Sequence, residues 1–199
     1  CPMWDERYST DDYVYGTEPN DFLREQAEPI GEAPKRVLCL ADGEGRNGVY
    51  LAGLGHWVTS VDASSVGLRK AAQLAEEKGV ALTTLNADLT AHEFAPESYD
   101  AVVSIFCHLP TAGRPHLPRQ VIRALKPGGV LILEAYTPQQ ATRNTGGPGT
   151  PDRTLTAAEL DAAFAELEIQ LSRECEREVL EGRGHTGAGC VVQFIARKP

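Results

Sequence analysis

A glycine-rich turn between two apolar runs carries the clearest chemical signal in this chain. Residues 37–40 are apolar and lead into the turn 42–45 (DGEG), after which we predict a helix over 46–52. A second apolar run, 57–61, ends on Asp62. Glycines let backbone N–H groups and a helix N-terminus approach a ligand closely, and a carboxylate at the end of a strand can accept hydrogen bonds from two ribose hydroxyls. The segment therefore predicts a β-turn-α-β unit that holds a nucleoside.

The same glycines also match a dinucleotide-binding pattern. Gly43, Gly45 and Gly48 follow the G-x-G-x-x-G spacing, and Asp62 lies about twenty residues farther on. A chain of 199 residues, however, lacks room for the second half and the substrate domain that such enzymes usually carry. Near the turn only Arg46 is placed to bind a phosphate. We therefore favour a ligand with one nucleoside and no pyrophosphate, and keep an NAD(P)-dependent oxidoreductase as the alternative from another enzyme class.

Predicted strands and helices alternate around this unit. Apolar runs predict strands over 81–85, 99–106 and 130–136, while capping residues and apolar spacing predict helices over 64–78 and 114–125. Mostly continuous apolar strands that alternate with helices are typical of a parallel sheet covered on both faces.

The pattern changes after residue 136. A loop rich in Pro, Gly and Thr over 137–153 is long enough to suggest a function. A capped helix over 156–165 and two strands, 168–180 and 189–197, follow, with 181–188 as an antiparallel hairpin tip. We expect a single domain over 1–199, composed of an N-terminal lid with helices (1–30), a cofactor-binding half (35–136) and a substrate-side loop, helix and hairpin (137–199).

Composition and charge disfavour several kinds of partner. The net charge is −9, which repels phosphate backbones, so we expect no nucleic-acid partner. The five cysteines form no CxxC pair and are not spaced with the histidines as metal ligands, so we expect no metal. No stretch is long or apolar enough to span a bilayer and no signal-peptide pattern opens the chain, so we expect no membrane partner and a cytoplasmic location.

Several ordered motifs resemble those of the class I S-adenosylmethionine-dependent methyltransferases. VLCLADGEGRN resembles the family's first motif, commonly V-L-D-L-G-C-G-x-G-R-N, and VTSVDAS resembles the second. LNADL resembles the adenine-contacting segment, YDAVVSIFCHLP the fourth motif, and ALKPGGVLILEAY the turn and fifth strand. The Arg-Asn after the glycine turn, the N-terminal WDERY, YVYG and PNDFL segments and the GGPG loop resemble the tellurite-resistance, TehB-like branch, which is related to the thiopurine and small-thiol methyltransferases.

This resemblance implies a fold, a cofactor and a site. The fold is an α/β three-layer αβα sandwich with a Rossmann-like seven-stranded sheet of order 3-2-1-4-5-7-6, strand 7 antiparallel, and a site at the switch between strands 1 and 4. The cofactor is S-adenosyl-L-methionine, with S-adenosyl-L-homocysteine as product. Asp62 would bind the ribose and Asp88 the adenine amine. The implied cofactor-binding positions are Trp4, Tyr8, Tyr15, Gly16, Ala41, Asp42, Gly43, Glu44, Gly45, Arg46, Asn47, Asp62, Ala63, Ala87, Asp88, Leu89 and Phe106.

Two positions depart from the family pattern. Cys39 stands where the family usually has an acidic residue, and Ala41 where it has the first glycine. Cys39 cannot fix the turn as a carboxylate would, and Ala41 requires either a negative φ or a small strain. We expect Asp42 to restore a negative charge near the methionine end, and cofactor binding to survive but weaken. A non-catalytic nucleoside-binding module stays an alternative because of these two residues.

The N-terminal aromatic residues and the acceptor side are less specific. Trp4, Tyr8 and Tyr15 are placed like the aromatic lid of the thiol-methylating relatives, and a simple cover for the sheet edge is the alternative. No motif names a catalytic residue. Soft nucleophiles such as a thiolate, a selenide or a reduced tellurium oxyanion need little general-base help, so we favour a thiol or another chalcogen over an O- or N-methylated small molecule. Candidates for substrate contact, each with a structural alternative, are His108, Tyr136, Arg143, Arg183 and His185. We expect a small-molecule methyl acceptor and a monomer or homodimer.

Overall fold

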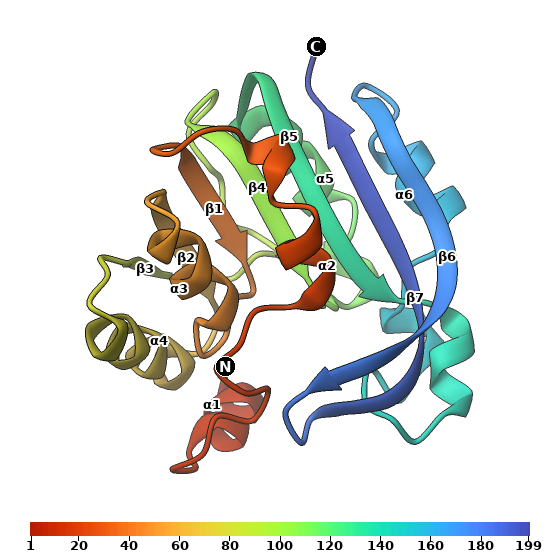
Figure 1. Ribbon diagram of the computed structural model, residues 1–199. Coiled ribbons are helices and arrows are strands. Elements are labelled where there is room, and N and C mark those ends of the chain that lie inside the picture. Colours follow the sequence, from red (N-terminus) through yellow and green to blue (C-terminus); the bar gives the residue numbers. More distant parts are fainter.

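One twisted sheet of seven strands organises residues 1–199, all of which the computed structural model describes (Figure 1). The strand order is β3-β2-β1-β4-β5-β7-β6, and β7 runs antiparallel to both of its neighbours. The predicted sheet order and the antiparallel strand 7 are therefore confirmed. The strands are β1 (Arg36–Leu40), β2 (Trp57–Asp62), β3 (Thr83–Asn86), β4 (Tyr99–Ile105), β5 (Leu125–Tyr136), β6 (Glu168–Glu181) and β7 (His185–Arg197).

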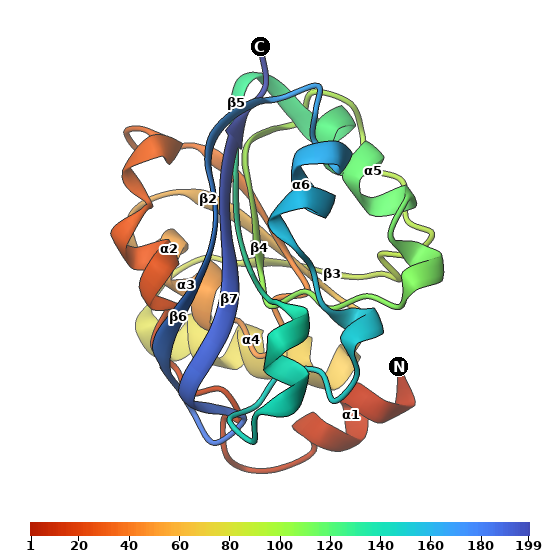
Figure 2. The ribbon, with the colours of Figure 1, turned by 90° about the vertical axis from the view of Figure 1, so that its right-hand side faces the viewer.

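Helices cover both faces of the sheet, as Figure 2 shows edge-on. α2 and α3 lie on one face, and α5 and α6 lie on the other. α4 packs against α3 and the β2–β3 edge, and α1 packs against α4. The segment 87–98 between β3 and β4 contains no helix. The helices are α1 (Pro2–Tyr8), α2 (Asp21–Glu25), α3 (Arg46–Gly53), α4 (Ser65–Lys78), α5 (His116–Ala124) and α6 (Ala157–Ala163), with short 3-10 turns at Glu28–Ile30, Thr111–Gly113, Pro138–Thr142 and Pro151–Arg153.

The apolar strand β1 shows why the sheet is buried on both sides. Its side chains alternate between the faces, so Val37 and Cys39 pack towards α2 and α3. Leu38 and Leu40 pack towards α5 and α6. Cys39 is thus a small apolar core residue. A continuous apolar run is what a strand covered on both faces requires.

The β6–β7 hairpin turn is shorter than the sequence predicted. We expected the tip over 181–188, but β7 already begins at His185, so only residues 182–184 connect the strands. Gly182 adopts a φ of +65°, which non-glycine residues rarely do, and a Cβ there would lie 2.4 Å from the Val14 carbonyl oxygen. This glycine allows the tight turn to pack against the N-terminal segment.

None of the helices combines the length and the apolar character that crossing a bilayer requires.

Candidate functional site

A cavity of about 740 Å³ opens at the carboxyl ends of β1, β2 and β4. This is the switch point of the sheet, where the chain leaves β1 and β4 in opposite directions. The volume lies in the range of roughly 300–1,000 Å³ that small-molecule sites occupy. Its lining comes from the N-terminal segment 3–16, the glycine turn 41–47, the strand ends 62–63, 88–89 and 105–109, the loop 146–153 and the hairpin turn 183–185.

The three glycines of the turn have different surroundings. Gly43 lines the cavity at a φ of +53°, and a Cβ there would lie 2.6 Å from the hydroxyl of Tyr8. A Cβ at Gly45 would lie 2.5 Å from that of Ala71, so this glycine lets α3 approach α4 and does not line the cavity. Gly48 packs equally closely beneath the turn. Only Gly43 is placed to let a ligand approach the backbone.

Asp42 fixes the turn from inside. Its Oδ2 accepts hydrogen bonds from the Ser60 hydroxyl at 2.6 Å and from the Gly48 N–H at 3.2 Å. Burial raises the pKa of this carboxyl to about 7. Asp42 lines the cavity as predicted, while one of its oxygens joins β2 to the start of α3. Ala41 adopts a φ of +48°, so of the two conformations considered for it the strained one occurs.

Asp62 faces the cavity from the end of β2. Its Oδ2 accepts from the Gly43 N–H and its Oδ1 from the Ser64 N–H, both at 2.8 Å. An ionised carboxylate has about four acceptor positions, so capacity for two more hydrogen bonds remains. Burial raises the pKa of this group. The carboxylate is thus held rigidly against the glycine turn, with free lone pairs for hydroxyl donors.

Asp88 marks the opposite wall of the same half. It is exposed, and its Oδ1 accepts from the backbone N–H and the hydroxyl of Thr90 at 2.9 and 2.6 Å. These hydrogen bonds lower its pKa. Leu89 lines the cavity beside it, whereas Ala87 does not. Asp88 is an ionised acceptor whose Oδ2 is free.

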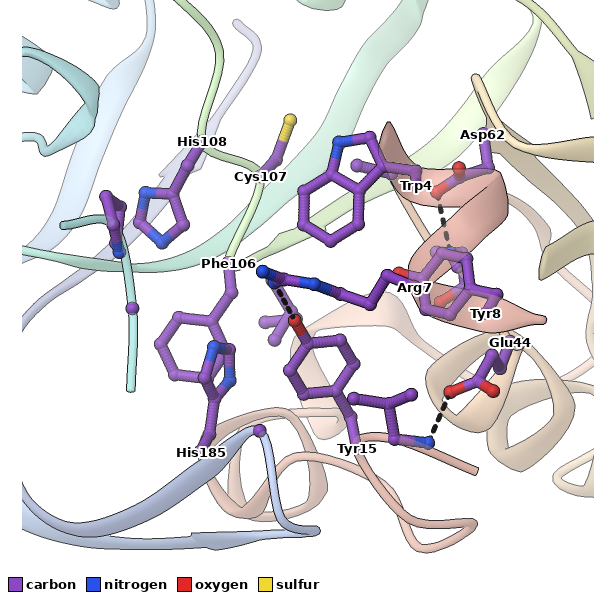
Figure 3. A pocket seen from close by; sticks show the side chains of 18 of the residues that line it. Trp4, Arg7, Tyr8, Tyr15, Glu44, Asp62, Phe106, Cys107, His108 and His185 are labelled. Carbon is purple, nitrogen blue, oxygen red and sulfur yellow. Dashed lines mark hydrogen bonds between the residues drawn. The ribbon is translucent and has the colours of Figure 1, made fainter. Parts of the chain in front are cut away.

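The N-terminal segment forms one wall of the cavity (Figure 3). Trp4 and Tyr8 stack with ring centroids 5.7 Å apart, and Tyr15 lies edge-on to Tyr8 at 6.5 Å. The Arg7 guanidinium lies over Trp4, and its Nη1 donates to the Tyr15 hydroxyl at 3.1 Å. Figure 3 shows this side chain reaching across the cavity between Trp4 and Tyr15. Arg7 is a cation at the site that sequence reasoning missed.

A buried ion pair attaches this segment to the glycine turn. Glu44 Oε1 accepts from the Val14 N–H at 2.8 Å, and its Oε2 pairs with Lys70 of α4. The Lys70 ammonium also donates to the carbonyl oxygens of Tyr8 and Thr10, at 3.3 and 3.0 Å, and to that of Asp12. One lysine therefore gathers three carbonyls of the N-terminal segment beside the cavity.

An aromatic and imidazole cluster forms the far wall. Phe106 follows β4 at a φ of +51°, a strained conformation that turns its ring into the site. His185 lies 4.8 Å from Phe106 and 4.5 Å from Tyr15, between ring centroids. His108 stacks on the same cluster, 5.6 Å from Tyr136. Residues far apart in the chain thus meet on one wall.

The two histidines of this wall carry unpaired nitrogens. His108 Nδ1 hydrogen-bonds the Arg153 carbonyl oxygen at 3.0 Å, but its Nε2 has no protein partner, nor has His185 Nδ1. Burial lowers the pKa of His108 to about 4 and that of His185 to about 3. Both rings are neutral at pH 7, so each unpaired nitrogen can bind a ligand group without adding charge.

The other predicted substrate contacts differ in position. Tyr136 is fully buried behind Phe106, stacked at 4.6 Å, and does not line the cavity, although its hydroxyl is also unpaired. Arg183 lines the cavity and lies 3.9 Å from the Asp12 carboxylate. Arg143 lies outside the cavity lining and pairs with Glu176 at 2.8 Å. The loop contributes residues 146–150 and Arg153 to the lining instead, because glycines 146 and 147 pack against His185 and Tyr136.

Behind Arg46 lies a buried polar network that the sequence did not reveal. Arg46 pairs with Glu181 at 2.9 Å, and the Asn20 side chain donates to both Glu134 and Glu181, at 2.9 and 2.7 Å. Arg177 pairs with Glu134. The network joins α3, the N-terminal segment and strands β5 and β6, which come from distant parts of the chain. It explains why an Arg-Asn pair follows the glycine turn: Asn47 Oδ1 accepts from the Asn20 N–H at 2.9 Å.

Comparison with known proteins agrees with this architecture. Residues 37–129 match the family model described as a methyltransferase domain. An uncharacterized methyltransferase of Bacillus subtilis, YbaJ, is 32% identical over 120 residues, which cover 55% of this chain and 47% of that protein. The chain spans about half the length of the curated relatives it matches.

Solved structures match over more of the chain. One, from work on the conversion of a disulfide bond into a thioacetal group during echinomycin biosynthesis, superposes with a TM-score of 0.79 at 18% identity and covers 99% of this chain and 91% of its own. TehB from Haemophilus influenzae superposes with a TM-score of 0.70 at 23% identity, covering 88% of this chain and 61% of its own. The chain has the fold of the class I S-adenosylmethionine-dependent methyltransferases, and its residues 37–129 are similar to a methyltransferase domain.

Proposed function

We propose that this protein transfers a methyl group from S-adenosylmethionine to a small molecule, on a thiol sulfur or another chalcogen. One observation carries the proposal: a single cavity at the β1/β4 switch joins a carboxylate-lined glycine turn to a wall of neutral, unpaired imidazoles. The first half suits a nucleoside with a cationic centre. The second suits an acceptor that needs no strong base. The assignment to a TehB-like branch is part of the same proposal.

The residues of the cofactor half fit S-adenosylmethionine. Asp62 has free lone pairs for two ribose hydroxyls, and Asp88 has a free oxygen for the adenine amine. Gly43 allows close approach to the backbone of the turn. The Tyr8 ring already lies against Gly43, so the N-terminal segment would cover the nucleoside as a lid.

Charge favours this cofactor over a dinucleotide. The carboxyl groups of Asp42, Asp62 and Asp88 line the half that contains the glycine turn, although Asp42, with its pKa raised to about 7, carries only part of a negative charge at pH 7. Negative groups attract a sulfonium and an ammonium and repel a pyrophosphate. Of the cations that contact the turn, Arg46 is neutralised by Glu181 at 2.9 Å and Lys70 by Glu44. The space that a pyrophosphate needs at the second glycine of the pattern is taken by Ala71, which packs on Gly45.

The acceptor half favours a nucleophile that loses its proton without the help of a protein base. A thiol has a pKa of about 8.5, so reaching the thiolate at pH 7 costs about 2 kcal/mol. Histidines whose pKa values are lowered to about 4 and 3 are too weakly basic to deprotonate an alcohol efficiently. His108 Nδ1 donates to the Arg153 carbonyl oxygen, so its neutral Nε2 is an acceptor for the S–H of a thiol, whereas His185 Nδ1 can donate to a thiolate or a chalcogen oxyanion in the Nδ1–H tautomer. The solved structure concerned with a disulfide and a thioacetal supports sulfur chemistry on this fold.

The chain's own residues supply alignment and exclusion of water. When bound, S-adenosylmethionine would supply an activated methyl group for displacement from its sulfonium sulfur by the acceptor sulfur. His108 Nε2 accepts from the S–H of the thiol as it enters, and the thiol loses its proton to solvent before the site closes. His185 Nδ1 can then donate to the thiolate. Trp4, Tyr8 and Tyr15 exclude water from the cavity.

Isothermal titration calorimetry with S-adenosylhomocysteine, run beside NADH, tests the cofactor. We expect micromolar binding of S-adenosylhomocysteine alone, followed by turnover with thiols, selenite or tellurite in a methyl-transfer assay. Binding of NADH alone would overturn the proposal. Binding of S-adenosylhomocysteine without turnover on any of these acceptors would leave a nucleoside-binding module or an O- or N-methyltransferase, which hydroxyl and amine acceptors then distinguish.

A further inference from the structure

A second cavity of about 430 Å³ lies on the α5/α6 face of the sheet. Its floor consists of side chains from the central strands, Leu40, Leu131 and Leu133, and its walls come from α5, α6 and the segment 153–155. The lining is mostly apolar. The apolar side chains of such a lining favour an apolar ligand group over water. Figure 2 shows α5 and α6 on this face of the sheet.

The second cavity and the main cavity share part of their lining. Cys107, Leu109 and Arg153 line both cavities. Burial raises the pKa of the Cys107 thiol to about 12, so this shared wall is uncharged at Cys107 and apolar at Leu109. His108, with its unpaired Nε2, lies between these two residues in the chain and binds the Arg153 backbone. The second cavity therefore begins where the acceptor is expected to sit.

Positive charge gathers at this second cavity, although the whole chain carries a net charge of −9. Arg114, Arg119 and Arg153 line it, against one carboxylate, Glu159. Arg114 lies 3.8 Å from Glu159. Neither Arg119 nor Arg153 has a carboxylate within salt-bridge distance. An unpaired guanidinium beside an apolar cavity matches a ligand with an acidic group and an apolar body.

We infer that the methyl acceptor is an amphipathic anion, whose apolar body occupies the second cavity and whose acidic group pairs with Arg153. Arg153 lines both cavities, so the acidic group lies close to the nucleophilic atom. An α-mercapto fatty acid has this arrangement of thiol, carboxylate and alkyl chain. The inference rests on the proposed function and names the substrate class of the same site.

Chain length gives the first test. With α-mercaptooctanoate and thiolactate, which share one head group and differ by five methylenes, we expect kcat/KM to favour the long acid by about 30-fold or more. Each buried methylene contributes roughly fourfold, so burial of about half of the added chain gives this ratio. Ala163→Trp, which enlarges a residue on the cavity wall, should bring the ratio close to one. The matched Ala162→Trp alters a neighbouring exposed residue outside the lining and should keep the ratio. A wild-type ratio near one overturns the inference.

Charge gives the second test. Arg153→Gln should lower kcat/KM for α-mercaptooctanoate about tenfold while changing that for the uncharged octanethiol less than about twofold. Arg69→Gln, which alters an exposed arginine on α4 outside the lining of both cavities, serves as the control. An equal loss with both thiols would mean that Arg153 acts through His108 or the loop and would overturn its role as the anion partner.

A binding measurement separates this inference from the proposed function. We expect octanoate to bind, by calorimetry, to protein saturated with S-adenosylhomocysteine, and Ala163→Trp to weaken it about tenfold or more. Failure of S-adenosylhomocysteine to bind refutes the proposed function. Binding of S-adenosylhomocysteine with no octanoate binding and no chain-length preference refutes the substrate class alone.

Discussion

The two halves of the main cavity differ in how their buried polar groups are paired. In the cofactor half Asp42, Asp62 and Glu44 are each held by hydrogen bonds or an ion pair within the protein. In the acceptor half His108 Nε2 and His185 Nδ1 have no partner. Buried polar atoms are normally paired, so unpaired ones mark places where a ligand supplies the missing contact. Each buried carboxylate of the first half therefore already has protein partners, whereas the two imidazole nitrogens of the second half await a ligand.

The stability contributed by the titratable groups of the two halves changes with pH in opposite directions. The lowered pKa values of His108 and His185 mean that the native state binds fewer protons than the unfolded state below pH 6.5, so their contribution to stability is lost as pH falls towards 4. Asp42, with its pKa raised to about 7, contributes stability that is present at low pH and lost as pH rises from about 4 to 7. The two trends oppose each other in the same pH window.

Substitution at His185 should produce the largest effect. His185→Phe keeps the ring in the aromatic cluster but removes the titrating group, so it should retain about 2–3 kcal/mol more of its unfolding free energy between pH 6.5 and 4 than wild type does. Urea unfolding at a series of pH values measures this. Asp42→Asn is the matched change in the other half and should steepen the loss on acidification. Identical pH profiles for His185→Phe and wild type would contradict the comparison.

The second-largest effect is expected from removing the charge of Asp62, which should weaken cofactor binding. Asp62→Asn replaces an oxygen that ribose hydroxyls are expected to use, and hydrogen bonds to a charged acceptor are the stronger ones. We expect the Kd for S-adenosylhomocysteine to rise about 100-fold by calorimetry. Asp100→Asn is the control, because Asp100 accepts from the Arg36 N–H at the opposite end of the sheet. Equal affinities for the two variants would exclude Asp62 as the ribose acceptor.

Removal of the unpaired nitrogen of His108 should lower turnover and leave cofactor binding unchanged. His108→Phe keeps a ring on the stack with Phe106 and Tyr136 but loses Nε2. We expect kcat/KM for a thiol acceptor to fall about tenfold, with the Kd for S-adenosylhomocysteine changed less than about twofold. His92→Phe, outside the cavity lining, should change neither value. A parallel loss of cofactor affinity would place His108 in the cofactor half instead.

The same contrast explains what the sequence could and could not predict. The cofactor half comes from contiguous residues, 36–63, where apolar runs, glycines and a terminal Asp62 define strand, turn and acceptor locally. The sheet order followed from strand and helix alternation together with the family resemblance, and it was confirmed. Gly45 and Ala87 were predicted to contact the cofactor but do not line the cavity. A local sequence motif does not determine which way each of its residues faces.

The acceptor half depends on long-range contacts, and there prediction was weaker. His108 and His185 were named and do line the cavity, but Arg7 and Arg153 were missed, since nothing in their local sequence indicates where they lie. The hairpin turn was placed too wide because Gly187 was taken as a loop residue, whereas β7 accommodates it. The buried polar network around Glu134 and Glu181 could not be predicted from the sequence, because it joins residues 20, 134, 177 and 181, which lie far apart in the chain.

The smallest expected effect concerns Arg183 and Arg143, which the sequence analysis named together as candidates for substrate contact. Arg183 lines the cavity, lies 3.9 Å from the Asp12 carboxylate and donates to the Thr10 hydroxyl at 3.3 Å. This long ion pair leaves its charge able to act on an anionic acceptor. Arg143 is paired with Glu176 outside the lining, and exposed pairs contribute about 1 kcal/mol or less to stability. We therefore expect Arg183→Gln to lower kcat/KM about threefold at low salt, and Arg143→Gln to leave it unchanged. If Arg143→Gln had the larger effect, the loop 137–153 would have to close over the cavity during turnover, and the acceptor half would be mobile as well as incompletely paired.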